Sequence, residues 1–308
     1  MLDPNKQSST TITHIVEINE EGCSLKDFLR DRYGISSRLL SKMKKSRQIR
    51  MNGQYAPYHT QVYRGDEIEM NFEEDPNAYP RVSMNLDIAY EDLDLLILNK
   101  QPGIVTHPTR GHHEDTLTNG VVDYFQRIGL NMKIRFVNRL DMNTSGLLII
   151  AKNPFAHFDL MKQMQEDLVI KHYLTWVHGV VGKDRGVIEG RIFNPEGSEG
   201  RRVIDPKGQA SRTGYEVLER KKDRTLLKVR LYTGRTHQIR VHLSSMGHPI
   251  MGDTLYCYGK DPIEEEKFPR QALHAYELEF FQPRYRTKLR VQAAMPKDME
   301  RLFQNPSA

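Results

Sequence analysis

Hydrophobic positions first recur at helical spacing in residues 24–34, SLKDFLRDRYG. Leu25, Phe28 and Leu29 fall on one face of a helix, with polar residues between them. The segment begins with a serine that is followed by an acid three positions later, which is typical of a helix N-terminus. It ends at a glycine, which suits a helix C-terminus. The pattern therefore predicts one short helix.

A second helix is predicted to begin at residue 36 or 37, with Leu39, Leu40 and Met43 on its buried side. Short alternating segments follow, separated by Asn52–Gly53, a strong hairpin signal, and by the turn Gly65–Asp66. Two helices followed by a small sheet predict a compact α/β module that ends near residue 72.

Longer elements are predicted further along the chain. The runs 95–99 (LLILN) and 147–151 (LLIIA) are almost entirely apolar, as expected for central strands. Helical spacing in 116–128, 155–168 and 236–247, and alternation in 169–181 and 225–232, complete the predicted elements. We expect an α+β fold with a large mixed, mainly antiparallel sheet.

These patterns divide the chain into five parts. An acidic segment with two prolines and no periodicity is typical of a linker. We expect an N-terminal extension at 1–18, the small module at 19–72, the linker at 73–81, a large domain at 82–300 and a tail at 301–308.

Positive charge is concentrated in the small module. The whole chain carries 45 Lys and Arg against 40 Asp and Glu, a net charge of only +5. Residues 30–50 alone contain eight Lys or Arg and one acid, Asp31, so the remainder of the chain is close to neutral. A solvated helix face is the ordinary explanation of such a run, but this segregation favours a surface that follows phosphates. The candidate contacts with RNA or DNA are Arg38, Lys42, Lys44, Lys45 and Arg47.

Several other classes of protein are disfavoured. No segment approaches the roughly 18 consecutive apolar residues of a spanning helix, and the first residues do not resemble a signal peptide. Cys23 and Cys257 form neither a CxxC pair nor a disulfide framework, so we expect a cytoplasmic protein. His237 and His242 are five residues apart, unlike the pair in HExxH, and the sequence lacks phosphate-loop, GxGxxG and GxSxG motifs. We expect no metal and no cofactor.

The segment FVNRLDMNTSGLLIIAKN, residues 136–153, places Asp141 just before a buried strand. An ion pair between Asp141 and Arg139 at the surface is the ordinary interpretation. The alternative is a catalytic carboxylate that a half-buried arginine of TGRTHQIRVH, residues 233–242, keeps ionised. Tyr173 in KHYLTWV is by itself more typical of a core or interface than of a catalytic site.

These segments resemble a known family. In the same order, NRLDMNTSGLLIIAK, KHYLTWVHG, TGRTHQIRVHL and ALHAYELEF are similar to the motifs HRLDxxTSGLLLxAK, KxYxAxVxG, GRTHQIRxHL and LHAxxLxF of the RluA-type pseudouridine synthases. Residues 88–108 resemble the opening strand and loop of that family, so the resemblance covers roughly residues 82–296. The first module resembles a small ribosomal-protein-type RNA-binding module. Two positions depart from the family pattern: Asn138, where histidine is usual, and Gln101, where proline is usual.

The resemblance implies an isomerase that converts uridine in folded RNA to pseudouridine without cofactor or metal. It implies that Asp141 starts cleavage of the glycosidic bond, as a nucleophile or by initiating elimination, and that Tyr173 stacks on the base and helps to remove the C5 proton. Arg235 is expected to pair with Asp141, with Arg240 as the alternative, and Arg139 is expected to fill the space of the flipped nucleotide.

The resemblance also suggests the partner. Ribosomal RNA of the large subunit is the expected substrate, transfer RNA is the alternative, and the chain is expected to be a monomer. A non-catalytic RNA-binding factor for ribosome assembly, built on the same fold, is the competing function. A nuclease is a third possibility, but the sequence lacks clustered carboxylates that would bind its metal.

Overall fold

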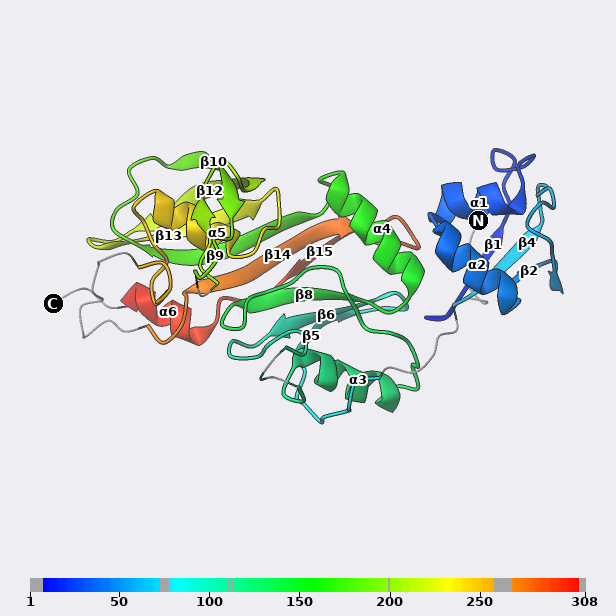
Figure 1. The fold of residues 1–308 in the computed structure, drawn as a ribbon, viewed down its shortest axis with the longest axis horizontal. Coiled ribbons are helices and arrows are strands. Elements are labelled where there is room, and N and C mark those ends of the chain that lie inside the picture. The colour runs from blue at the N-terminus through cyan, green and yellow to red at the C-terminus, as the bar shows by residue number, and fades with distance from the viewer. Residues whose placement is uncertain are drawn as a thin grey trace.

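The computed structural model describes residues 8–72, 78–109, 111, 113–198, 200–257 and 268–304. It contains a small module, at the right of Figure 1, and a large domain built on one long sheet. Within the described residues, no helix has both the length and the apolar character needed to cross a membrane.

The small module has the predicted helices and a four-stranded sheet in the order β1-β4-β2-β3. Ser24 accepts a hydrogen bond from the Asp27 backbone and Gly34 adopts a left-handed conformation with φ 61°, so both ends of the first helix are as predicted. Asn52 and Gly53 both have positive φ, as a two-residue hairpin turn requires. The elements are β1 (Thr11–Ile15), α1 (Leu25–Tyr33), α2 (Ser37–Lys45), β2 (Ile49–Met51), β3 (Gln54–Tyr55) and β4 (Glu67–Asn71).

The large domain has an eleven-stranded sheet in which nine strands follow the order β11-β10-β12-β13-β9-β14-β8-β6-β5, while β15 pairs with β14 and β7 with β8. The mixed, mainly antiparallel sheet is as predicted, and β8 with β14 is the one parallel pair among the described strands. Its strands are β5 (Ile88–Glu91), β6 (Leu95–Lys100), β7 (Arg135–Phe136), β8 (Ser145–Ala151), β9 (Ile170–His178), β10 (Arg185–Phe193), β11 (Val203–Ile204), β12 (Gln209–Arg220), β13 (Arg224–Leu231), β14 (Leu273–Phe281) and β15 (Lys288–Gln292). Its helices are α3 (Leu117–Arg127), α4 (Pro154–Gln165), α5 (Gln238–Ser245) and α6 (Lys297–Gln304).

The apolar runs of β6 and β8 are buried on both faces of the sheet. Leu96 and Leu98 pack in the same cluster as Phe125 of α3, whereas Leu95 and Ile97 pack in a second cluster with residues of α4. Successive side chains of a strand point to opposite faces, so two helices on opposite sides require an apolar residue at every position.

Gly146 lies where β8 begins to run beside β14. Its φ is 109°, and a Cβ added there would lie 2.2 Å from the carbonyl oxygen of Ala275. Any larger residue would therefore push these two central strands apart. The small turn before β8 thus has a structural reason for its glycine.

The module is attached to the large domain through a buried ion pair. Arg284 donates to both carboxylate oxygens of Asp94, and its remaining donors reach the carbonyls of Thr11 and Ser8 at 3.0 and 2.9 Å. Asn153 bridges the same two parts, because its Nδ2 donates to Asp94 and to the carbonyl of Ser9. These contacts fasten the start of β1 to the large domain.

The domain boundaries differ in two places from the expected ones. β1 pairs along its whole length with β4, so the small module begins by residue 11 and the expected extension at 1–18 is too long. α6 crosses the expected start of the tail at residue 301. Both elements are completed by partners distant in sequence, which local patterns do not reveal. Residues 1–7, 73–77 of the expected linker and 305–308 of the tail lie outside the described residues.

Candidate active site

The segment between β7 and β8 carries the candidate carboxylate. The side-chain amide of Asn138 pairs with the backbone of β8: Oδ1 accepts the N–H of Ile149 at 2.8 Å, and Nδ2 donates to the carbonyl of Leu147 at 3.2 Å. This pairing holds the segment against the strand and leaves Arg139 exposed and Asp141 partly exposed. The amide supplies both a donor and an acceptor, which accounts for asparagine at this position.

A buried lysine supports the backbone beside Asp141. Lys100, at the end of β6, donates from Nζ to the carbonyls of Gln101, Ile104 and Met142 at 2.9, 3.1 and 2.9 Å. Burial lowers the pKa of Lys100 to about 7, against the opposing effect of the Asp141 charge. The sequence reasoning missed this residue. In the sequence, its burial was indicated only by its position at the end of the largely apolar segment 95–100.

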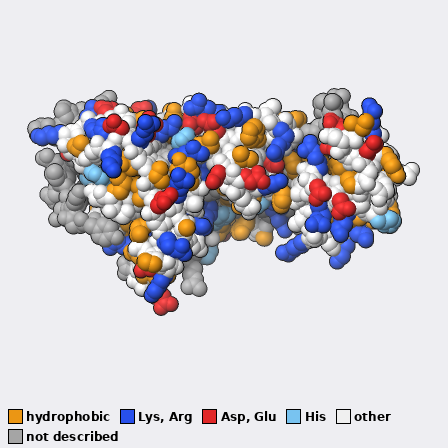
Figure 2. Space-filling view, turned by 90° about the horizontal axis from the view of Figure 1, so that it is seen from above, with side chains coloured by type: hydrophobic (Ala, Val, Ile, Leu, Met, Phe, Trp, Pro, Cys, Tyr) orange, Lys and Arg blue, Asp and Glu red, His pale blue; other side chains and the backbone are white. Residues whose placement is uncertain are grey.

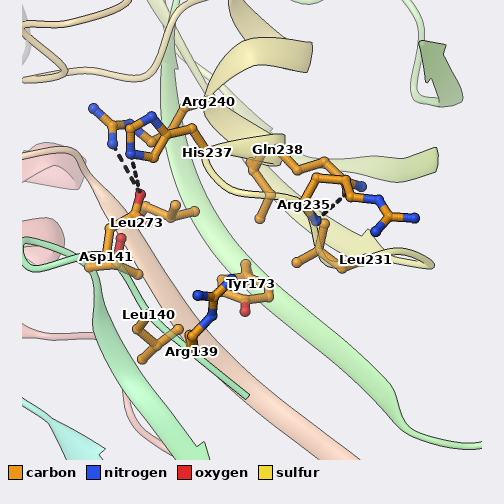
Figure 3. A pocket seen from close by; sticks show the side chains of 12 residues that line it. Arg139, Leu140, Asp141, Tyr173, Leu231, Arg235, His237, Gln238, Arg240 and Leu273 are labelled. Atoms are coloured by element: carbon orange, nitrogen blue, oxygen red, sulfur yellow. Dashed lines mark hydrogen bonds and ion pairs between the residues drawn. The ribbon is translucent and has the colours of Figure 1, made fainter. Parts of the chain in front are cut away.

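Asp141 pairs with Arg240, as Figure 3 shows. The Nη1 atom of Arg240 lies 3.0 Å from Oδ2 of Asp141, while its Nε and Nη2 atoms bind the two oxygens of Asp253 at 2.6 and 2.9 Å. The Asp253 side chain is fully buried, whereas that of Asp141 is 29% exposed. Although burial opposes it, the hydrogen bonds and charges of Asp253 and Asp141 raise the pKa of Arg240. One guanidinium therefore joins a buried carboxylate to an accessible one.

The prediction that Arg235 pairs with Asp141 is wrong. Arg235 is exposed, and its Nε donates to the carbonyl of Ala210 at 3.4 Å. Its side chain extends away from Asp141 in Figure 3. The reason is local: Gln238 accepts the backbone N–H of Arg235 at 3.0 Å, which fixes a turn before α5, and the helix then carries Arg240 to the carboxylate.

His237 occupies a strained position at this turn. Its φ is 57°, in the left-handed region that residues other than glycine rarely adopt. Its Nδ1 atom lies 2.9 Å from the hydroxyl of Tyr256, and its Nε2 atom lies 3.9 Å from Oδ2 of Asp141. Burial lowers the pKa of His237; Asp141 opposes this, and Arg240 and Arg202 add to it. No role was predicted for His237, Asp253 or Tyr256, because their contacts form only in the folded chain.

Tyr173 and Arg139 line the same cavity as Asp141. This groove has a volume of about 820 Å³ and extends from the Asp141 loop along the end of β13 to the turn before α5. Tyr173 lies on β9 with its side chain buried, and burial followed by the Asp141 charge raises its pKa. The structure therefore brings Asp141, Tyr173, Arg139 and Arg240 together, and leaves Arg235 on the rim.

The five basic candidates of the small module lie in or just after α2. Leu40 and Met43 of this helix are buried. The side chains of Arg38, Lys42, Lys44, Lys45 and Arg47 are all exposed. Figure 2 shows Lys and Arg side chains gathered over this module, at the right of the view. The surface has the charge and exposure that phosphate contacts need.

No group of three or more His, Cys, Asp or Glu side chains suited to a metal ion occurs in the parts of the chain that the structure describes. Cys23 and Cys257 are not joined in a disulfide. The described site presents a carboxylate, guanidinium groups and a phenol.

The sequence places this site in a known class. The model of a family described as RNA pseudouridylate synthase matches residues 94–245, which include Asp141, Tyr173 and Arg240. The RNA pseudouridine synthase YjbO of Bacillus subtilis, named as uncharacterized, is 36% identical over 273 residues, covering 88% of this chain and 95% of that protein. The chain therefore belongs to the RNA pseudouridine synthases and is an isomerase that acts on RNA.

Further comparisons show which type of pseudouridine synthase the chain resembles. The ribosomal large subunit pseudouridine synthase D of Nitrosomonas europaea is 39% identical over 235 residues, or 75% of this chain and 68% of that protein. The structure of human RNA pseudouridylate synthase domain containing 1 is similar with a TM-score of 0.55 and 25% identity, over 73% of this chain and 96% of that one. Within the family, the chain is of the RluA/RluD type.

Proposed function

We propose that this chain converts specific uridines of large-subunit ribosomal RNA to pseudouridine, with Asp141 as the catalytic carboxylate and no cofactor. The observation that carries the proposal is the pairing of a partly exposed Asp141 with Arg240 inside a cavity that Tyr173 and Arg139 also line. A guanidinium held by the buried Asp253 gives the carboxylate a fixed counter-ion and a fixed direction.

The reaction balances without a further reactant. The bond between N1 of the base and C1′ of the ribose breaks, either as an Asp141 oxygen bonds to C1′ or as Asp141 removes a proton from the sugar to start elimination. The detached base turns and C5 bonds to C1′, either as the Asp141–C1′ bond breaks or as Asp141 returns the proton to the sugar. The proton on C5 then moves to N1. The bound RNA has to keep water from the intermediate, since hydrolysis would cut the base from the RNA.

The target base must leave its stack before Asp141 can reach C1′. Extrusion from a folded RNA costs a few kcal/mol. Arg139 is exposed two residues from Asp141, and a planar guanidinium can both stack on neighbouring bases and donate hydrogen bonds in the vacated space. We therefore assign Arg139 to the gap that the flipped uridine leaves.

Tyr173 is assigned first to stacking on the extruded base. Because its pKa is raised, the phenol is neutral near pH 7 and is a poor base while Asp141 is charged. Formation of a sugar ester at Asp141 would remove the negative charge that contributes to this rise. Help from Tyr173 in removing the C5 proton therefore belongs after glycosidic cleavage.

The RNA class is inferred from relatives and from charge. Three relatives, 39, 37 and 33% identical to this chain, are named ribosomal large subunit pseudouridine synthase D. The exposed basic side chains of α2 give the small module a surface suited to structured RNA. A binding-only assembly factor would not need the Asp141–Arg240 pair in the cavity that Tyr173 and Arg139 line.

The proposal is tested by mapping pseudouridines in RNA treated with the purified protein. Unmodified large-subunit and small-subunit ribosomal RNA and a transfer RNA mixture are incubated separately, then treated with carbodiimide and read by primer extension. We expect new stops at one or a few uridines of the large-subunit RNA. Stops confined to transfer RNA, or none in any RNA, would contradict the assigned substrate.

A further inference from the structure

A second cavity lies beside the Asp141 groove and has no role in the chemistry described above. It has a volume of about 390 Å³, within the range of ligand sites. Three of its lining residues are basic, and none of the described residues that line it is acidic. The basic residues are Arg202, Lys207 and Arg235.

Arg202 has one guanidinium nitrogen that lacks a hydrogen-bond partner in the described part of the chain. Its side chain is half-buried, and its Nη1 atom is buried without a hydrogen-bond partner among the residues that the structure describes. A buried guanidinium nitrogen without an acceptor is costly unless a ligand supplies one. Its backbone N–H donates to the hydroxyl of Tyr256 at 2.9 Å, which holds the Arg202 backbone at the cavity edge.

The walls are fixed by the ends of β10 and β12. A Cβ added at Gly208 would lie 2.4 Å from the carbonyl carbon of Ile192, so the two backbones meet closely at this wall. Asp205, the acid of the adjoining turn, accepts the backbone N–H of Lys207 at 2.8 Å and does not line the cavity. Phe193 adds an apolar wall. The cavity is therefore preformed, cationic and partly aromatic.

The cavity is continuous with the candidate active site. Arg235 and Thr236 line both this cavity and the Asp141 groove. In Figure 3 the Arg235 side chain extends away from Asp141. A ligand here would be joined to the nucleotide at Asp141 by a short length of chain, which an RNA strand provides.

We propose that this cavity binds a phosphodiester of the RNA strand next to the flipped uridine, through Arg202, Lys207 and Arg235. It rests on the proposed function in placing the target uridine at Asp141 and in the choice of large-subunit ribosomal RNA as the probe. The guanidinium of Arg202 donates to phosphate oxygens in the geometry that arginine and phosphate prefer. In this proposal Arg235 binds the RNA phosphate and does not pair with Asp141.

The test compares Arg202→Gln with Arg191→Gln. Arg191 is exposed on β10 and is not among the residues that line the cavity. Both changes are made in Asp141→Asn protein, and binding of transcribed large-subunit ribosomal RNA is measured over a series of salt concentrations. Because turnover plays no part, the result does not depend on whether Asp141 is the catalytic residue.

We expect Arg202→Gln to raise Kd about tenfold and to reduce the slope of log K against log salt by about 0.7. Arg202→Lys should recover most of the slope but only part of the affinity, and Arg191→Gln should change Kd less than twofold. In protein with Asp141 intact, Arg202→Gln should raise KM and leave kcat within twofold. An unchanged Kd, a loss equal to that of Arg191→Gln, or a fall in kcat at constant KM would overturn the inference.

Discussion

Arg240 lies between two carboxylates that differ in accessibility. Asp253 is fully buried and takes two donors of the guanidinium, which leaves a third donor for Asp141. Removing one partner of a buried ion pair typically costs 3–5 kcal/mol, so Asp253 holds Arg240 in place whether or not RNA is bound. Asp141, on the open side, is the accessible carboxylate of the two.

At the residue scale, the burial of His242 also predicts that the stability of the fold depends on pH. It is fully buried between the hydroxyls of Ser211 and Thr213, at 2.9 and 2.8 Å, and burial lowers its pKa to about 4. Because the unfolded chain takes up this proton near pH 6.5 and the folded chain only near pH 4, stability falls as pH decreases through that window.

We expect His242→Gln to flatten this fall in chemical denaturation measured between pH 7 and pH 4.5. The shift corresponds to a few kcal/mol at most, since one pKa unit is about 1.4 kcal/mol. His59→Gln, at an exposed histidine, is the control and should keep the wild-type slope. Equal slopes in all three proteins would show that His242 does not set the pH dependence.

Sequence motifs indicated that an arginine of residues 233–242 pairs with Asp141, but they favoured the wrong one. The choice depends on the left-handed backbone at His237 and the cap from Gln238, which set the direction in which α5 begins. Asn138 is similar: its pairing with β8 depends on a strand reached only after the turn. Local sequence patterns do not reveal the direction in which α5 begins or the strand with which Asn138 pairs.

At the scale of elements, prediction worked where the forces are local. α1 and α2 form from caps, apolar spacing and stop signals within about ten residues, and their starts match the expected ones. The position of β14 between β9 and β8, parallel to the latter, required long-range pairing that no single segment encodes. Asp141 sits beside that central pair, so its setting was predictable only in part.

α2 carries the prediction for RNA binding at this scale. Reversing Lys44 and Lys45 to Glu should weaken binding of large-subunit ribosomal RNA and reduce the slope of log K against log salt by about one or more, because phosphate contacts release counterions. The matched control reverses Lys183 and Lys222, exposed in loops of the large domain, for the same net charge. If the control lowers the slope equally, net charge and not α2 determines binding.

At the scale of the whole molecule, the small module is held at a fixed position beside α4. The Arg284–Asp94 pair is fully buried and reaches the start of β1, and the ring of Tyr33 packs at 5.3 Å from that of Phe155. A fixed position sets the distance from the basic face of α2 to Asp141. This distance limits which folded RNAs can contact α2 and Asp141 at the same time.

We expect Arg284→Met to destabilise the protein by about 3–5 kcal/mol, because it leaves Asp94 buried without its cation. Lys162→Met is the control: Lys162 and Glu166 form an exposed ion pair at the end of α4, so its loss should cost about 1 kcal/mol or less. Urea denaturation measures both. Similar losses in the two variants would mean that the buried pair does not fasten the module.

The central claim is that Asp141 performs the isomerisation, and release of tritium from RNA labelled at uridine C5 tests it most directly. The wild-type protein and Asp141→Asn are compared on large-subunit ribosomal RNA at saturating concentration, with RNA affinity measured in parallel. The account predicts release by the wild type, and a fall of at least 10⁴-fold on loss of a catalytic nucleophile, with affinity kept within about tenfold. Equal release by both proteins would contradict it.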